Sequence, residues 1–543
     1  MNRSTRTLMA LTGLLFTPLA LAAGELPGCD FNGGDDDLAV GVPGEKIVAS
    51  GEGAVSAIFD SQAVDDEFLH QGLGGIDEEG QYNDRFGEAL ACGDFNGDGL
   101  DDLAIGVPGR DHSGYADAGT VWVLFGSYDG FELEDELVNS PQRWDEVALL
   151  GSSGDGHEFG AELTTGDFDG SGCDDLAIAA PGAEVDGESE AGAVYVLYSD
   201  CELGLEHETD KGWEFNQLLD LTDAPEAGDR FGSALAAGEF NGDGFDELVV
   251  GVPLEDEPIG GEELRDVGVV HVFFGGSDGL LIGNEGETET IFQNFMDDGV
   301  EADDQFGFSL AVADFDADGL EDLAIGVPFE DIEGFVNVVV NAGAVNVMYG
   351  TPCGLVCHQT RWQFWHQDSV LDGEPIDDVA EANDQFGYAL TVVDYCHPWA
   401  IPSEFDKLVD PGHDLIVGAP GENAAEGLVH VICGSPFGLT AGIRLYDPTV
   451  GSWFQDLFDW TFSQFYDPSE LPEAGDRFGA ALSSRERSQI DVGIPGESTD
   501  GAANAGMVAA GFYGWGELLL WSQNNPDITD EAETDDCFGT ELP

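Results

Sequence analysis

The chain has very few basic residues. Its 543 residues include 15 lysines and arginines against 110 aspartates and glutamates, which gives a formal net charge of −95 at pH 7. So large a negative charge repels nucleic acid and anionic membranes. It therefore excludes the classes of protein that bind the phosphate groups of nucleic acids or of membrane lipids. The same charge attracts cations. Apolar residues make up 42% of the chain and aromatic residues 10%, so wholesale disorder is excluded and a sizeable core is expected.

The chain also lacks a long apolar run after its first 22 residues. The N-terminal run Leu8–Ala22 follows two arginines, is too short to span a membrane with confidence and ends in an A-x-A pattern. These are the features of a secretory signal, so we predict cleavage after Ala22 and export to the periplasm or the extracellular space. A lipoprotein signal ending at Leu26–Cys29 is the less favoured alternative.

Familiar catalytic motifs are missing as well. The ten histidines are scattered, and none forms the H-E-x-x-H zinc motif. The sequence contains no G-x-S-x-G nucleophile elbow and no evident Cys/His pair. We therefore predict that the chain is not an enzyme.

Glycine is abundant, with 77 residues, which favours turns and short strands over long helices. The stretch Arg85–Gly109 (RFGEALACGDFNGDGLDDLAIGVPG) contains an FG pair, an acidic loop, an apolar run and a proline, and these parts recur along the chain. The seven FG pairs begin at Phe86, Phe159, Phe231, Phe306, Phe386, Phe478 and Phe538. The seven apolar runs end at Pro43, Pro108, Pro181, Pro253, Pro328, Pro420 and Pro495.

A third element recurs in phase with the first two and is rich in valine and aromatic residues. It begins at Gly53, Gly119, Gly192, Gly268, Gly343, Gly427 and Gly506. These stretches read as buried strands, and more variable aromatic stretches at 142–150, 213–219, 291–296, 361–365 and 453–458 suit a fourth strand. Four strands in each of seven units predict an all-β fold, a seven-bladed β-propeller. A β-sandwich array with coincidental spacing is the alternative, which three motif series in phase disfavour.

The two ends of the chain carry complementary halves of one repeat. The first proline has no FG pair before it, and the last FG pair has no proline after it. Joining Phe538–Leu542 (FGTEL) to Pro27–Gly34 (PGCDFNGG) restores the register seen at Phe86–Asp98. We therefore predict that residues 23–543 form one propeller, whose ring is closed by pairing both ends, because closure removes exposed strand edges.

The acidic loop Asp94–Asp102 (DFNGDGLDD) carries oxygen side chains at positions one, three, five and nine, and glycine at position six. This resembles the start of an EF-hand calcium loop, and Leu100 at position seven offers a backbone carbonyl. The loop departs from the EF-hand because it joins two strands and has no glutamate at position twelve. We predict Ca²⁺ rather than Mg²⁺, because the ligand set is large and comes from the protein.

Four consecutive loops keep this pattern. The predicted metal ligands are Asp94, Asn96, Asp98, Leu100 and Asp102; Asp167, Asp169, Ser171, Cys173 and Asp175; Glu239, Asn241, Asp243, Phe245 and Glu247; and Asp314, Asp316, Asp318, Leu320 and Asp322. The alternative, an Asx-rich turn, does not need clustered carboxylates that repel one another. The first loop, Asp30–Asp37, is one residue shorter, and its binding of calcium is left open. The sixth loop is interrupted by 395–413, and the seventh, Ser483–Asp491, has lost the ligands.

The RFG pair, the DFNGDGLDDLAIGVPG segment and the GTVWVLFG strand together resemble the FG-GAP repeat family, best known from the N-terminal propeller of integrin alpha subunits. The resemblance covers the chain from about Glu25 to Leu542. It implies calcium in the loops between the first and second strands of each blade. It also implies that ligands bind at the opposite face, through loops before each FG pair and after each proline.

From the residues and the resemblance we expect a secreted, calcium-binding module for recognition or adhesion, with an unknown protein or glycan as ligand. A lectin-like propeller that binds glycans between its blades is the alternative, followed by a hydrolase or lyase. The segment Phe329–Gly343 is a candidate ligand-face loop, although we interpret it as a hairpin extension. The ligand, the oligomeric state and the role of the remaining acidic charge are left open.

Nine cysteines in an exported chain predict disulfides with one cysteine left over. The blade plan favours the pairs Cys173–Cys201, Cys396–Cys433 and Cys353–Cys357, whose members lie at the same blade end or close in sequence. A disulfide between Cys29 and Cys537 is disfavoured. If the two ends of the chain join to complete one repeat, these cysteines lie about 26 Å apart along one strand.

Overall fold

The computed structural model describes residues 29–440, except for 34–36, 44–46, 48–50, 60–66, 77–78, 132, 134–139, 202, 208–210, 212, 219–223, 260–261, 282–287, 294–298, 334–337, 358–360, 372–373, 376–378, 394–411 and 423–426. Beyond residue 440 it describes 445–447, 452–454, 461–462, 477, 480–485, 489–494, 507–510 and 519–521.

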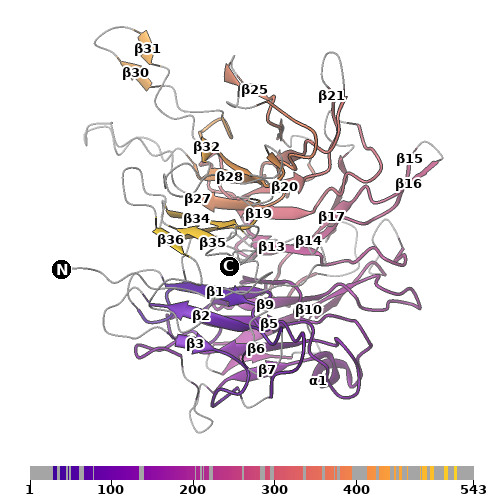
Figure 1. Ribbon diagram of the computed structural model, residues 1–543, viewed down its shortest axis with the longest axis vertical. Helices are drawn as coiled ribbons and strands as arrows, with labels where there is room; N and C mark the ends of the chain where they lie inside the picture. The colour runs from indigo at the N-terminus through magenta and orange to yellow at the C-terminus, as the bar shows by residue number, and fades with distance from the viewer. Residues whose placement is uncertain are drawn as a thin grey trace, which may run out of the picture.

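The described residues form an all-β fold of antiparallel sheets that follow one another along the chain (Figure 1). The first sheet is β1 (Leu38–Val42), β2 (Ala54–Ile58) and β3 (Glu67–Leu69). The second is β4 (Leu90–Gly93), β5 (Asp102–Val107), β6 (Thr120–Leu124) and β7 (Gln142–Trp144). The third is β8 (Leu163–Gly166), β9 (Asp175–Ala180), β10 (Ala193–Asp200) and β12 (Glu214–Phe215), with β11 (Gly204–Glu206) paired to the end of β10.

Four further sheets repeat the four-stranded plan. The fourth is β13 (Ala234–Gly238), β14 (Glu247–Val252), β17 (Val269–Phe273) and β18 (Thr288–Ile291). The fifth is β19 (Ser309–Ala313), β20 (Asp322–Val327), β23 (Ala344–Met348) and β24 (Trp362–Trp365). The sixth is β27 (Leu390–Val393), β28 (Asp414–Ala419), β29 (Leu428–Ile432) and β32 (Thr461–Phe462). The seventh is β33 (Leu482–Arg485), β34 (Gln489–Ile494), β35 (Met507–Ala510) and β36 (Leu519–Trp521).

Within the part of the chain that the structure describes, short hairpins and the helix α1 interrupt this plan. The hairpins are β15 (Glu257–Ile259) with β16 (Glu262–Leu264), β21 (Ile332–Glu333) with β22 (Val338–Val339), β25 (Val370–Leu371) with β26 (Glu374–Pro375), and β30 (Leu445–Asp447) with β31 (Ser452–Phe454). The helix α1 (Glu146–Leu150) is capped at its N-terminus by Asp145, whose Oδ1 accepts the N–H of Ala148 at 2.9 Å. No helix among the described residues is long and apolar enough to cross a membrane.

The strands agree with the sequence pattern except in three outer stretches. Of the described residues in 291–296, only Ile291 is in a strand, because β18 ends there. Only the first part of 142–150 is a strand, because the Asp145 cap starts α1 directly after β7. The stretch 453–458 does not supply the fourth strand of the sixth sheet, since Trp453 and Phe454 belong to β31, and β32 takes that edge instead. The segment Phe329–Gly343 carries the hairpin β21–β22, which confirms the interpretation as an extension.

The core lies between successive sheets. One buried cluster joins Val249 and Val270 of the fourth sheet to Leu310 and Leu323 of the fifth. Equivalent clusters lie between the other neighbouring sheets from the first to the sixth. Because both faces of the strands are covered, the central strands read as continuous apolar runs. The first strands β4, β8, β13, β19, β27 and β33 pack beside one another in that order.

The FG pair connects neighbouring sheets. Phe159 is fully buried, and its N–H donates to the carbonyl of Ala118 at 3.1 Å, just before the third strand of the preceding sheet. A Cβ atom at Gly119 would lie 2.1 Å from the Phe159 carbonyl oxygen, and Gly119 has φ +83°. Only glycine suits this close approach, and Gly53, Gly192, Gly268 and Gly343 approach the phenylalanine of the next FG pair in the same way.

Candidate metal centres

The four complete acidic loops join the first and second strands of the second to fifth sheets. Each loop ends on the first residue of a second strand, as Asp102 does at β5. Within the first of these loops Gly97 and Gly99 have φ +71° and +84°, so glycine permits the tight turn. The sequence correctly placed these loops at sheet ends.

The carboxylate at position one organises each loop. Asp94 accepts the N–H of Asp98 at 3.1 Å and that of Gly99 at 2.9 Å. The equivalent carboxylates in the other three loops each accept two backbone N–H groups. Asp167 accepts those of Ser171 and Gly172; Glu239 accepts those of Gly242 and Gly244; and Asp314 accepts those of Asp318 and Gly319. The loop backbone therefore wraps around a carboxylate, which leaves oxygen atoms concentrated inside the turn.

The acid at position nine is buried beneath the loop. Asp102 is fully buried, and its two carboxylate oxygens accept the N–H of Phe95 at 3.0 Å and that of Gly126 at 2.9 Å. Burial raises the pKa of Asp102 to about 9, and the nearby carboxylates of Asp98 and Asp94 also raise it. Burial likewise raises the pKa of Asp175 to about 8 and that of Glu247 to about 9. A cation bound in the loop would stabilise the charged form of these acids.

Three of the four loops gather carboxylates closely. In each set three carboxylates offer oxygen atoms that all lie within 4.8 Å of one another. The sets are Asp167, Asp169 and Asp175; Glu239, Asp243 and Glu247; and Asp314, Asp316 and Asp322. Among the described residues, Asp94, Asp98 and Asp102 do not gather to this limit. Hard divalent cations such as Ca²⁺ are bound by oxygen clusters of this kind.

Hydrogen bonds between the residues at positions five and seven stabilise the turn. The N–H of Leu100 donates to Asp98 Oδ1 at 3.0 Å, and the same bond links Phe245 to Asp243 and Leu320 to Asp318. In the third loop Ser171 Oγ donates to the Cys173 carbonyl at 3.3 Å, so this predicted carbonyl ligand already has a partner. At position three, Asn241 donates to Glu247 at 2.7 Å, and Asn96 is buried.

Two loops already contain a basic side chain. Lys211 Nζ lies 2.6 Å from Asp169 Oδ2 and 4.6 Å from the centroid of the Tyr198 ring. Arg361 pairs with Asp316 and lies 3.8 Å from the centroid of the Tyr349 ring. A cation bound in either loop would share its position-three acid with this positive charge, which would weaken its binding.

The acids at position eight have a role that the sequence analysis missed. Asp174 Oδ2 accepts the N–H of Asp94 at 2.9 Å, and the Asp174 N–H donates to the Asp94 carbonyl at 3.2 Å. Asp101, Asp246 and Glu321 cap the preceding loops in the same way at Asp30, Asp167 and Glu239. The two consecutive acids at positions eight and nine were the sequence signal for this contact. The position-nine acid bonds within its own loop, and the position-eight acid bonds to the neighbouring loop.

The incomplete loops are only partly described. Asp37 Oδ2 accepts the N–H of Phe31 at 3.1 Å, as the position-nine acids do, while residues 34–36 lie outside the described residues. In the sixth repeat Asp414 takes the buried position, and its Oδ1 accepts the N–H of Gly434 at 2.8 Å. Asp394 and most of the interrupting segment lie outside the described residues.

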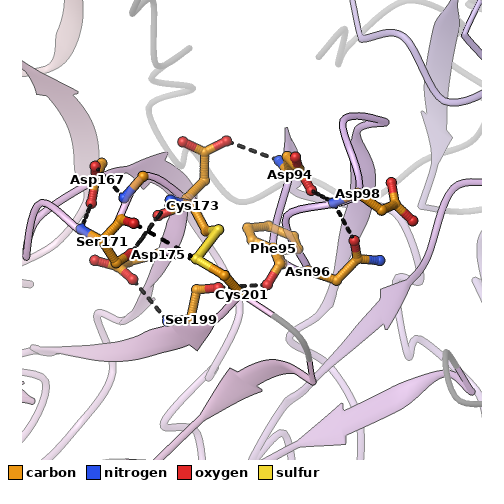
Figure 2. The surroundings of a disulfide bond; sticks show 12 residues. Asp94, Phe95, Asn96, Asp98, Asp167, Ser171, Cys173, Asp175, Ser199 and Cys201 are labelled. Atoms are coloured by element: carbon orange, nitrogen blue, oxygen red, sulfur yellow. Dashed lines mark hydrogen bonds between the residues drawn. A yellow bond between two sulfur atoms is a disulfide. The ribbon is translucent and has the colours of Figure 1, made fainter.

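The disulfides confirm two predicted pairs and add one. Cys173 is bonded to Cys201, and Cys353 to Cys357. Figure 2 shows the Cys173–Cys201 bond between the Asp94 and Asp167 loops. Cys433 is disulfide-bonded, and its predicted partner Cys396 lies outside the described residues. The unpredicted pair Cys29–Cys92 joins the first repeat to the second.

A family model for the FG-GAP repeat matches residues 86–124, 159–197, 231–273 and 306–348. These four segments of the chain are therefore FG-GAP repeats. Each matched FG-GAP repeat runs from the FG pair to the third strand, so the four matches contain the four complete acidic loops. The resemblance to the integrin alpha propeller is confirmed by integrin alpha-PS2 of Drosophila melanogaster, which is 27% identical over 241 residues, 44% of this chain and 14% of that protein.

A second relative corrects one prediction. Phosphatidylinositol-glycan-specific phospholipase D of Bos taurus is 33% identical over 172 residues, 32% of this chain and 19% of that protein. FG-GAP repeats thus occur in enzymes, and the prediction that the chain is not an enzyme is wrong on this finding. Missing motifs were a poor guide, because a fold does not determine the activity of the proteins that contain it.

The matches are partial. The chain spans 14% and 19% of the length of these two relatives. Among solved structures, the Dos1 propeller is similar over 81% of this chain and 70% of that chain, with 12% identity and a TM-score of 0.33.

Proposed function

We propose that the chain is an exported β-propeller whose acidic loops bind calcium and whose opposite end binds a protein or glycan ligand, as a recognition or adhesion module. The observation that carries the proposal is the gathering of three carboxylates within 4.8 Å in each of three loops. Each set includes a position-nine acid buried beneath its loop. Carboxylates held this close repel one another unless a proton or a cation lies between them.

Seven blades in a closed ring are part of this proposal. The described residues contain seven sheets of three or more strands, and the first of them lacks the first strand that the others have. Residues 538–542, which carry the last FG pair, lie outside the described residues. Their sequence suits that missing strand, and pairing there would leave no open edge between the last and first blades.

The topology supports a ligand site at the end opposite the calcium loops. In an antiparallel sheet the connection between the second and third strands lies opposite the connection between the first and second. The hairpins β15–β16 and β21–β22 lie in such second-to-third connections, and β25–β26 lies between β24 and the next first strand (Figure 1). These hairpins enlarge the surface that the integrin relationship associates with ligands.

Export is supported by the disulfides, because such bonds persist in oxidising compartments. The proposed signal at residues 1–22 lies outside the described residues.

Calorimetric titration of the chelator-treated protein with CaCl₂, with melting followed in parallel, tests the calcium sites. We expect wild type to gain melting temperature with calcium, because a ligand bound only by the native state stabilises it. The triple variant D167N/E239Q/D314N should bind three fewer ions and lose most of that gain. A charge-matched control, D129N/E206Q/D278N, removes three exposed acids and should behave as wild type. No change in melting of wild type with calcium would overturn the proposal.

A further inference from the structure

Two more carboxylate clusters lie away from the acidic loops. Glu301, Asp304 and Glu330 offer oxygen atoms within 4.8 Å of one another, and so do Glu381, Asp384 and Glu422. In each cluster two of the acids are no more than 2% exposed. One segment of each cluster precedes an FG pair, and the other follows the proline of a second strand. Both connections lie at the end of the sheets opposite the acidic loops.

A buried glutamine adds an unsatisfied oxygen to each cluster. Gln293, 1% exposed, donates its Nε2–H to Glu330, while its Oε1 has no hydrogen-bond partner. Gln367, fully buried, donates to Glu422 Oε2 at 2.7 Å, and its Oε1 likewise has no partner. Since buried polar atoms are nearly always satisfied, an unsatisfied carbonyl oxygen on a side chain that is hydrogen-bonded to one carboxylate of the cluster indicates a missing positive partner.

The second repeat shows a cation at the equivalent place. Arg110 stands two residues after its proline, where the fifth repeat has Glu330, and Asp84 stands where that repeat has Asp304. Arg110 Nη1 lies 2.7 Å from Asp84 Oδ2, and Asp84 is fully buried. A guanidinium therefore neutralises the buried aspartate there, whereas the fifth and sixth repeats replace it with another acid.

The acids occur together along the sequence. The pattern E-x-x-D-x-F-G begins at Glu226, Glu301, Glu381, Glu473 and Glu533. At the prolines that end the apolar runs, the pattern P-x-E ends at Glu45, Glu255, Glu330, Glu422 and Glu497. With the chain closed as a ring, these are the same five repeats. The second repeat has Gln81 and Arg110 in the two glutamate positions, and the third has Gly154 and Ala183. An acid pair before the FG pair thus accompanies a glutamate after the proline, as joint ligands would.

We propose that each of the two clusters binds a hard divalent cation through its three carboxylates and the glutamine carbonyl oxygen. These sites are separate from the acidic loops and place metal at the end of the blades that carries the hairpins. Carboxylate and amide oxygens are the ligands that Ca²⁺ and Mg²⁺ prefer. The cation supplies the charge that Arg110 supplies in the second repeat.

The stoichiometry of metal binding tests the proposal, measured by calorimetry with CaCl₂ and, in a separate arm, MgCl₂. The variant E330Q/E422Q should bind two fewer ions than wild type. The variant E330R/E422R copies the Arg110–Asp84 pair, so it should fold without metal and also bind two fewer. The control E184Q/E206Q removes two exposed acids and should keep the wild-type number. Loss of ions in D167N/E239Q/D314N but not in these variants would refute the second sites while leaving the loop sites intact.

A direct measurement decides the question even if the variants do not fold. Anomalous diffraction from wild-type crystals soaked in MnCl₂ should show a peak beside Gln293 Oε1 and another beside Gln367 Oε1. The absence of both peaks would overturn the proposal, because protonated carboxylates would then hold the clusters together.

Discussion

The carboxylate of Asp174 accepts the backbone N–H of Asp94, 80 residues earlier in the chain, at a distance of 2.9 Å. The second and third acidic loops are therefore joined directly, and the same bond recurs between each later pair up to the fifth loop. The loops form a connected series at one end of the sheets.

Replacing Asp174 with alanine should destabilise the protein by about 1.5–3 kcal/mol, because a part-buried hydrogen bond from a backbone N–H to a carboxylate is lost. Urea unfolding at neutral pH measures the change. The control E188A removes an exposed carboxylate and should alter the free energy of unfolding by less than about 0.5 kcal/mol. Equal stabilities for the two variants would show that the link between the loops contributes nothing.

Replacing Lys211 with methionine should tighten calcium binding in the Asp167 loop roughly two- to tenfold. The ammonium 2.6 Å from Asp169 Oδ2 competes with the ion for the same carboxylate, so removing it concentrates the negative charge. Titration with CaCl₂ measures the affinity, and K211R, which keeps the charge, is the control. Weaker binding by K211M would mean that Lys211 organises the loop instead of competing within it.

Without calcium the protein should be more stable at pH 5 than at pH 9. Burial raises the pKa of Asp102 to about 9, that of Asp175 to about 8 and that of Glu247 to about 9. The native state therefore keeps protons that the unfolded chain loses above about pH 4, so the free energy of unfolding decreases as pH rises from about 4 to 8–9. Melting temperature against pH in a chelator should fall across this range, and saturating CaCl₂ should flatten it. A melting temperature that rises with pH in the chelator would contradict the assignment.

Removing residues 538–543 should lower the melting temperature if the last FG pair completes the first sheet. The first sheet would then expose an unpaired edge strand and lose part of the core that Ala39 and Val55 share with the second. Thermal melting compares the truncated protein with one that lacks only residues 1–22. Identical melting curves would rule out closure of the ring by the C-terminal residues.

The sequence alone determined the repeated unit of this protein. The FG pairs, apolar runs and third-strand glycines are local patterns, and their spacing placed strands and acidic loops where the structure has them. The pair Cys173–Cys201 was predictable because both cysteines belong to one repeat. Only the outer stretches, where patterns vary, were placed wrongly, as at Trp453.

Only the tertiary structure decided which side chains meet across neighbouring sheets. The bond from Asp94 to Asp174 and the disulfide Cys29–Cys92 join residues 80 and 63 positions apart. Within one repeat, the meeting of Glu301 with Glu330 and of Lys211 with Asp169 depends on which connections share an end of the sheet. Sequence patterns mark some of these residues, but they do not assign the partners, because the stacking and connections of the sheets determine which side chains meet.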